Sequence, residues 1–271
     1  MCDWCIQHGE GKTWYLNAKN YSRKMYKERK AEGKAGSDVD LQRMVLEQIR
    51  DAISNYNTEQ WPSVKKSIEA FVHRTHFGQV VPLQDMERVM DIAWPIATMT
   101  CACRRQVRGL PDEDNFYCMG IGVGMYKWER WPDTYRGGVD FISPNEAKNL
   151  VRRLNRKGVV HTTWTFGTPY IGGICNCEYP VCLGIRGRLD FDLKVLVKGH
   201  HVAMVDPAKC NGCRLCVPRC QFGALKYSPS FEKVSIDLLK CFGCGLCETG
   251  CTRKAIHLEP RSKFPALANS W

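Results

Sequence analysis

A run of cysteines occurs twice in the last quarter of the sequence, with identical spacing each time. The two copies read, in order, Cys210-x2-Cys213-x2-Cys216-x3-Cys220 and Cys241-x2-Cys244-x2-Cys247-x3-Cys251. Three thiolates at three-residue spacing can hold three corners of a cubane within one tight loop, and the fourth cysteine then reaches the other cluster. The repeat therefore predicts two [4Fe–4S] clusters whose fourth ligands are exchanged between the runs.

The exchange assigns four cysteines to each cluster. Cluster I takes the first three cysteines of the first run and the last of the second, namely Cys210, Cys213, Cys216 and Cys251. Cluster II takes the first three cysteines of the second run and the last of the first, namely Cys241, Cys244, Cys247 and Cys220. Paired C-x2-C spacings also bind zinc. Zinc needs only four of these eight ligands, however, and gives no reason for two copies of the whole run.

Residues 200–260 resemble the bacterial two-cluster ferredoxins. The two runs carry this resemblance, together with Ala224-Leu225 and Ala255-Ile256, which follow them as an internal repeat. The resemblance implies a βαβ-βαβ module with pseudo-twofold symmetry. The proline that is usual after each fourth cysteine in that family is replaced here by Gln221 and Thr252.

Six further cysteines lie in two groups in the middle of the chain. They are Cys101, Cys103 and Cys118 in the first group and Cys175, Cys177 and Cys182 in the second. We expect folding to bring the groups together as one composite site in which a subset of four binds metal. All-thiolate ligation favours iron–sulfur clusters or zinc over harder metals. A third Fe–S cluster, a structural zinc and thiols without a permanent metal remain alternatives.

The same region extends the resemblance toward the N-terminus. Three segments contribute besides Cys101-x-Cys103-Arg104: Ser143-Pro144-Asn145-Glu146-Ala147, Gly158-Val159-Val160-His161 and Ile174-Cys175-Asn176-Cys177. With them, residues 95–260 resemble a group of ferredoxin-like proteins of anaerobes, in which a C-x-C-R…C region and an ICNC segment precede a two-cluster module. In that group the ICNC segment often continues with more adjacent cysteines than residues 178–182 supply.

The first residues contain another spaced set, Cys2-x2-Cys5-x2-His8. Cys2 and Cys5 are either metal ligands, with Cys175 or Cys182 as partners, or ordinary thiols. The histidines at positions 161, 200 and 201 are expected to be surface or core residues rather than ligands or proton carriers.

Composition and charge limit where such a protein can be located and what kind of partner it can bind. The chain has 271 residues with 16 cysteines and a formal net charge of +11. It has no apolar run of the roughly 18 residues that span a bilayer, and its start lacks the features of a secretory signal. We therefore expect a cytoplasmic protein with reduced thiols. The basic excess is diffuse, which argues against nucleic acid and suits solvated helix faces or an acidic protein partner.

The sequence predicts an α+β protein in four parts: a helical N-terminal region over 1–95, a cysteine-containing middle domain over 96–199, the two-cluster domain over 200–260 and a tail over 261–271. Within the first part, helices are expected over 15–34, over 41–53, from Pro62 onward and over 86–93. In the middle, Ser143 and Glu146 form a capping box that begins a helix. A strand over 159–164 and a glycine-rich loop over 167–177 follow.

These features together predict an iron–sulfur electron-transfer subunit of an anaerobic redox enzyme complex. Its partner is expected to be a flavoprotein or another metalloenzyme subunit, since the chain itself has no Walker A loop and no dinucleotide motif. The alternative is an oxidoreductase whose composite Cys101–Cys182 cluster is catalytic. A nucleic-acid-binding or regulatory iron–sulfur protein is the third interpretation.

Overall fold

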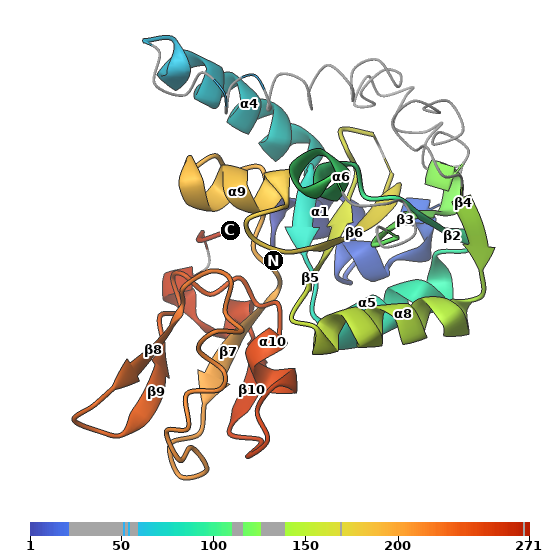
Figure 1. The fold of residues 1–271 in the computed structure, drawn as a ribbon. Helices are drawn as coiled ribbons and strands as arrows, with labels where there is room; N and C mark the ends of the chain where they lie inside the picture. The colour runs from blue at the N-terminus through green and yellow to red at the C-terminus, as the bar shows by residue number, and fades with distance from the viewer. Residues whose placement is uncertain are drawn as a thin grey trace.

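The computed structural model describes residues 1–21, 51, 54, 59–109, 116–125, 139–168, 170–267 and 269–271. Helices and strands are both present, so the α+β prediction is confirmed at that level (Figure 1). The helix expected over 41–53 and most of the one expected over 15–34 fall outside the described residues. In the part of the chain that the structure covers, no helix combines the length and apolar character needed to cross a membrane.

A six-stranded sheet forms the centre of the larger part of the molecule. Its strands are β1 (Gly78–Val80), β2 (Ile96–Met99), β3 (Cys118–Ile121), β4 (Val139–Ile142), β5 (Val160–Trp164) and β6 (Gly173–Cys177). Their order is β1-β5-β6-β3-β2-β4, and every neighbouring pair is antiparallel. Adjacent strands β3 and β6 therefore bring segments together that are more than 50 residues apart in the sequence.

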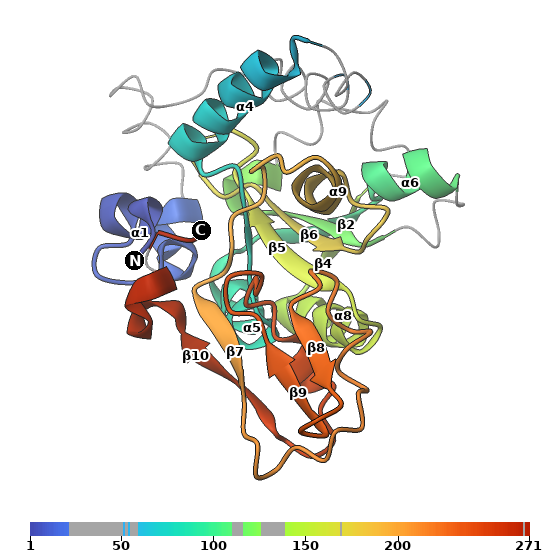
Figure 2. The ribbon, with the colours of Figure 1, turned by 90° about the vertical axis from the view of Figure 1, so that its left-hand side faces the viewer.

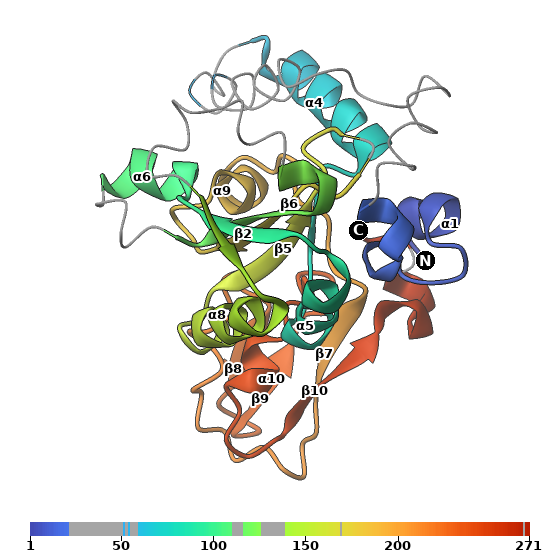
Figure 3. The same ribbon diagram turned by 90° about the vertical axis from the view of Figure 1, so that its right-hand side faces the viewer.

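Helices lie on both faces of this sheet, as Figure 3 shows. They are α4 (Trp61–Thr75), α5 (Leu83–Ile92), α6 (Ala102–Arg108), α8 (Pro144–Arg156) and α9 (Leu183–Asp190). Helices α5 and α8 pack side by side against one face and bury Met90, Leu154 and Ile174 among others. Helices α6 and α9 lie on the opposite side of the sheet, together with α4.

Helix α8 begins as the sequence predicts. The Ser143 hydroxyl accepts a hydrogen bond from the Glu146 backbone N–H, and the Glu146 carboxylate accepts one from the Ser143 backbone N–H. Pro144 occupies the first turn, where its missing N–H has no partner to lose. Helix α4 has Pro62 in the same position. The strand expected over 159–164 is also confirmed as β5.

Two expectations for the sheet are wrong. The N-terminal 95 residues are not wholly helical, because β1 pairs with β5 and contributes a strand to the central sheet. The loop expected over 167–177 ends in strand β6, which is paired on both sides. Both strands are short and glycine-containing, so tertiary pairing determines them rather than local propensity.

Residues 15–21, the described part of the helix expected over 15–34, form 3₁₀ turns instead. Helix α1 (Asp3–His8) is followed by the 3₁₀ turns η1 (Trp14–Leu16) and η2 (Ala18–Tyr21). The Asn20 side-chain amide donates to the backbone carbonyls of His8 and Trp14, at 3.0 and 2.6 Å. Such side-chain bonds to the backbone compete with helix formation.

The C-terminal module consists of two small antiparallel pairs around the cysteine runs. Strand β7 (His201–Val205) pairs with β10 (Ile256–Pro260), and β8 (Leu225–Ser228) pairs with β9 (Lys233–Ile236). A short helix, α10 (Leu246–Thr249), lies in the second run, whereas residues 215–219 of the first run form turns. The turns η5 (Arg261–Lys263) and η6 (Pro265–Leu267) follow, and the two termini lie close together (Figure 2).

Candidate metal centres

The four cysteines assigned to cluster II line one small cavity of about 20 Å³. Cys220 comes from the first run and lies among Cys241, Cys244 and Cys247 of the second. Burial raises the pKa of the Cys244 thiol to about 12, and the nearby Cys241 and Cys220 add to the effect. Ionising all four thiols in this buried place is unfavourable unless a bound cation compensates their negative charge. The donor set therefore fits a bound metal cluster.

The other four cysteines form a second set nearer the surface. Burial raises the pKa of the Cys216 thiol, and the charges of Cys251, Cys213 and Cys210 raise it further. Cys251, from the second run, thus lies beside the thiols of the first. Cys213 is exposed, whereas Cys241, Cys244 and Cys247 of the other set are buried. The module consequently has an outer and an inner thiol set.

Backbone N–H groups in the module donate hydrogen bonds to cysteine sulfur atoms. The N–H groups of Ala224 and Ala255 donate to the Sγ atoms of Cys220 and Cys251, each at 3.3 Å. These are equivalent contacts in the two copies of the repeat. Gly243 has a φ of +71°, and a Cβ there would lie 2.1 Å from the carbonyl oxygen of His201. The loop between the thiols can therefore approach β7 only with glycine at this position.

All six cysteines of the middle region line a single cavity of about 100 Å³. The set is Cys101, Cys103, Cys118, Cys175, Cys177 and Cys182. The Sγ atoms of Cys118 on β3 and Cys175 on β6 are 4.0 Å apart. The two groups that the sequence separates thus meet at one place, on the side of the sheet opposite α5 and α8.

Strand geometry explains this convergence. Side chains alternate between the faces of a strand, so Cys175 and Cys177 point to one face while Ile174 and Asn176 point to the other. Ile174 joins the core under α5 and α8. The Asn176 amide oxygen lies 2.6 Å from Nδ1 of His161, which burial keeps neutral by lowering its pKa to about 4. His161 is therefore a satisfied core residue, as expected.

The remaining thiols of the cavity come from helix starts. Cys101 is the N-cap of α6 and Cys182 is the N-cap of α9. The Arg104 backbone N–H helps to lower the pKa of Cys101, and the Leu183 backbone N–H offsets part of the rise in the pKa of Cys103. The positive end of a helix stabilises negative charge, so both helix starts offset part of the cost of burying ionised sulfur in the cavity.

Thiol–thiol hydrogen bonds lower the pKa of two of the six cysteines and raise the pKa of the other four. Hydrogen bonds from Cys103 and Cys118 lower the pKa of Cys101 to about 3. Those from Cys175 and Cys182 lower the pKa of Cys177 to about 5. The pKa values of the other four thiols are raised by the same hydrogen bonds and by burial. Cys101 and Cys177 are therefore the two thiols of the cavity whose pKa values are lowered by their neighbours.

A buried cation lies next to this charge. Arg104 is 2% exposed, and its Nη1 is 2.6 Å from Oε1 of Glu178. Its guanidinium also lies 3.7 Å from the centre of the Tyr117 ring. The rest of the wall includes Trp164 and Phe166, whose rings stack with centres 5.4 Å apart. The site is therefore shielded by apolar rings and carries one compensated positive charge.

The inner thiol set of the module and the middle cavity belong to the same hydrophobic core. That core contains Cys177 and Cys182 from the middle site, and Cys244 from the module. In the same core the rings of Phe222 and Phe242 stack with centres 4.0 Å apart and an interplanar angle of 10°. The two sites are thus joined by packed side chains.

Gln221, which stands where the ferredoxin family has proline, fastens the module to the middle domain. Its amide nitrogen donates to the Gly158 carbonyl at 2.6 Å, and its amide oxygen accepts from the Tyr179 backbone N–H at 2.8 Å. Arg219 adds hydrogen bonds to the carbonyls of Asn155 and Arg156, at 3.0 and 3.3 Å. Gln221 and Arg219 thus connect the segment with the cysteine runs to the loops around Gly158 and Tyr179.

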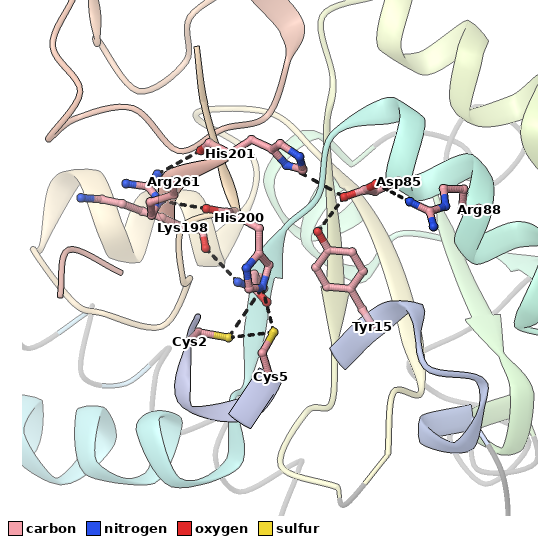
Figure 4. A network of polar contacts seen from close by, with 11 residues as sticks. Cys2, Cys5, Tyr15, Asp85, Arg88, Lys198, His200, His201 and Arg261 are labelled. Atoms are coloured by element: carbon pink, nitrogen blue, oxygen red, sulfur yellow. Dashed lines mark hydrogen bonds and ion pairs between the residues drawn. The ribbon is translucent and has the colours of Figure 1, made fainter. Parts of the chain in front are cut away.

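Cys2 and Cys5 do not lie with Cys175 or Cys182. Their Sγ atoms are 3.6 Å apart on α1, and both lie close to Nε2 of His200 (Figure 4). His8, which the sequence spacing suggested, packs its ring on Trp4 instead, with centres 4.5 Å apart. The Cys5 and His200 hydrogen bonds lower the pKa of the Cys2 thiol, whereas the pKa of Cys5 is raised. His200, which the sequence led us to expect as a surface or core residue, is the histidine that the fold brings to these thiols.

Comparison with known proteins supports the module. Residues 209–255 match the family described as 4Fe-4S dicluster domain. This match supports bound 4Fe-4S clusters and an iron–sulfur electron-transfer role. No curated protein matches the chain as a whole or in part.

Proposed function

We propose that this protein is an iron–sulfur electron-transfer subunit of an anaerobic redox enzyme complex. The observation that carries the proposal is the continuous arrangement of three thiol sites: an outer set containing exposed Cys213, an inner set around Cys244, and the six-thiol cavity in the same core. When bound, [4Fe–4S] clusters accept and release single electrons. The protein's contribution is to hold the thiolates, supply N–H donors to sulfur and exclude water from the inner sites.

Exposed apolar side chains on the module support a protein partner. Leu215 lies between Cys213 and Cys216 in the chain and is 58% exposed, and Leu239, just before the second run, is 60% exposed. Phe231, in the turn between β8 and β9, is 77% exposed. Large apolar groups that remain exposed beside a reactive site are typical of a docking surface. We propose that a flavoprotein or another metalloenzyme subunit binds there.

The experiment is purification of the protein from an anaerobic host under native conditions, followed by native mass measurement and activity assays. We expect it to co-purify with a redox enzyme and, when isolated, to exchange electrons with artificial carriers without converting an organic substrate. A Leu215→Ser variant should bind the partner less tightly while keeping its iron, and Leu189→Ser, an exposed leucine on α9, is the matched control. A lone monomer that turns over an organic substrate with a chemical reductant would contradict the proposal.

We also propose the exchanged ligand sets, with Cys220 on cluster II and Cys251 on cluster I. The position of Cys220 in the cavity of the second run supports this assignment. Cys220→Ala should then alter the same electron paramagnetic resonance signal as Cys244→Ala, because both remove a ligand from one cluster. Cys213→Ala should alter the other signal. If Cys220→Ala reproduces the spectrum of Cys213→Ala, the exchange is wrong.

For the middle cavity we propose a third Fe–S cluster held by four of its six thiols, with zinc as the alternative metal. Its all-sulfur donor set, six cysteines around one cavity, supports iron–sulfur or zinc binding over harder metals. Two thiols remain beyond the four that a cubane requires.

The surplus of thiols favours a second candidate function, an oxidoreductase with its chemistry at this cavity. A cluster with an exchangeable ligand, walled by Trp164 and Phe166, would give a small substrate an apolar place to bind. A change in the spectrum of this cluster on adding a candidate substrate would favour catalysis. An unchanged spectrum across candidate substrates favours electron transfer.

A further inference from the structure

The N-terminal thiols and His200 converge although 195 residues separate Cys5 from His200. The Sγ atoms of Cys2 and Cys5 are 3.6 Å apart, and Nε2 of His200 lies 3.6 Å from the first and 3.3 Å from the second. Both cysteines are buried, at 3% and 2% exposure. Three soft donors therefore meet in a protected place outside the other thiol sites (Figure 4).

These distances are close to those between ligands around one ion. A tetrahedral zinc ion, with Zn–S about 2.3 Å and Zn–N about 2.0 Å, holds its ligand atoms about 3.5–3.8 Å apart. A cubane, in contrast, binds each cysteine at a different iron, so its ligand sulfurs are spread over separate corners. The close contact of all three donor atoms thus favours a mononuclear site over another cluster.

The surroundings hold the ligands in position before any ion binds. Cys2 and Cys5 are three residues apart at the start of α1, which places both on one helix face. The Trp14 backbone N–H donates to Sγ of Cys5 at 3.3 Å, as outer donors do to metal-bound thiolates. Burial of both thiols also makes a free nucleophile an unsuitable role for them.

His200 is fixed from the other side by the C-terminal segment. Arg261 donates its backbone N–H to the His200 carbonyl at 2.8 Å and its guanidinium to the carbonyls of Gly199 and His201, at 2.9 and 3.2 Å. The imidazole itself lies between the rings of Tyr15 and Trp271, with centres 5.6 and 5.1 Å away. His200 is therefore presented to the thiols by a rigid backbone.

We propose that Cys2, Cys5 and His200 bind one zinc ion that clips the N-terminal segment to the start of the ferredoxin-like module. Cys₂His ligation with nitrogen and sulfur donors in tetrahedral arrangement suits Zn²⁺. Cys2 also lines a cavity of about 500 Å³, which gives water a route to the fourth position. Because His200 directly precedes β7, the ion would join α1 to the strand that begins the module.

The first test measures metal content and the zinc environment in the full-length protein purified anaerobically. We expect about one zinc per chain, in addition to iron, with two sulfur and one imidazole ligand in X-ray absorption at the zinc edge. Cobalt added to metal-depleted protein should show the visible bands of a tetrahedral thiolate site. Protein without any imidazole-ligated zinc, or with iron at these residues, would overturn the proposal.

A pair of histidine variants tests whether His200 or His8 is the zinc ligand. His200→Ala should lose most of its zinc, whereas His8→Ala, the matched control from the Cys2-x2-Cys5-x2-His8 pattern, should retain it. Iron content and cluster absorbance should be unchanged in both, which shows that the variants fold. Zinc loss in His8→Ala with retention in His200→Ala would refute the ligand set.

Amide hydrogen exchange gives a readout that does not depend on variants. Removing zinc from the intact protein with a chelator that spares the clusters should increase exchange in residues 3–16 and at the start of β7, and restoring zinc should reverse it. Unchanged exchange in both segments after zinc removal would contradict the clip.

Discussion

Fully reconstituted protein should contain about 12 iron atoms and about 12 acid-labile sulfides per chain, four of each for three clusters. Eight of each come from the two sets of four cysteines in the module, and the remainder from the six-thiol cavity. Iron and sulfide determination on protein handled without oxygen checks this directly. The expectation follows from the number of places where at least four thiols converge.

Two variants test whether the third cluster, with about four of the twelve iron atoms, lies in the middle cavity. Replacing Cys101, Cys118 and Cys175 together by serine leaves three thiols in the middle cavity, too few for an all-cysteine cubane, so iron should fall to about 8 per chain. Replacing Cys2 and Cys5 by serine should leave about 12. Unaltered protein with about 8 iron atoms would contradict the third cluster, and fewer than about 6 would contradict the two-cluster assignment.

The parts of the site that depend on local spacing could be predicted from the sequence. The two cysteine runs predict eight ligands because each loop of 11 residues already fixes the relative positions of its thiols. The ligand-like spacing of Cys175 and Cys177 is local as well, since alternate residues of a strand share a face. Their meeting with Cys118 depends on the pairing of β6 with β3, which no local pattern specifies.

At the N-terminal site, local spacing points to the wrong histidine. Regular spacing points from Cys2 and Cys5 to His8, but the ring of His8 packs on Trp4. The histidine that lies beside these thiols is His200, and its position depends on the backbone contacts of Arg261 near the other end of the chain. Similarly, β1 has only three residues, all buried, so it lacks the alternation that identifies a strand.

Removing the clusters should unfold the module while the sheet domain remains folded. The module spans about 60 residues, a size at which a hydrophobic core alone is marginal. Its two sheets have only two strands each, and isolated two-stranded sheets are at best marginally stable in water. Much of its core consists of cysteines, including buried Cys216, Cys241 and Cys247, so cluster loss removes the centre around which it packs.

Hydrogen exchange after iron removal by oxygen or a chelator is the measurement. Amides in β7 to β10 should exchange at rates close to those of an unfolded chain, because metal-binding free energy is folding free energy in such modules. Amides of α5 and α8 should stay protected, since the core between these helices and the sheet includes Met90 and Leu154 and none of the module's thiols. The zinc-directed variant His200→Ala provides the comparison, because it should loosen α1 without exposing β8 and β9. Native protection throughout residues 201–260 after complete cluster loss would show that the module's fold is independent of its metal.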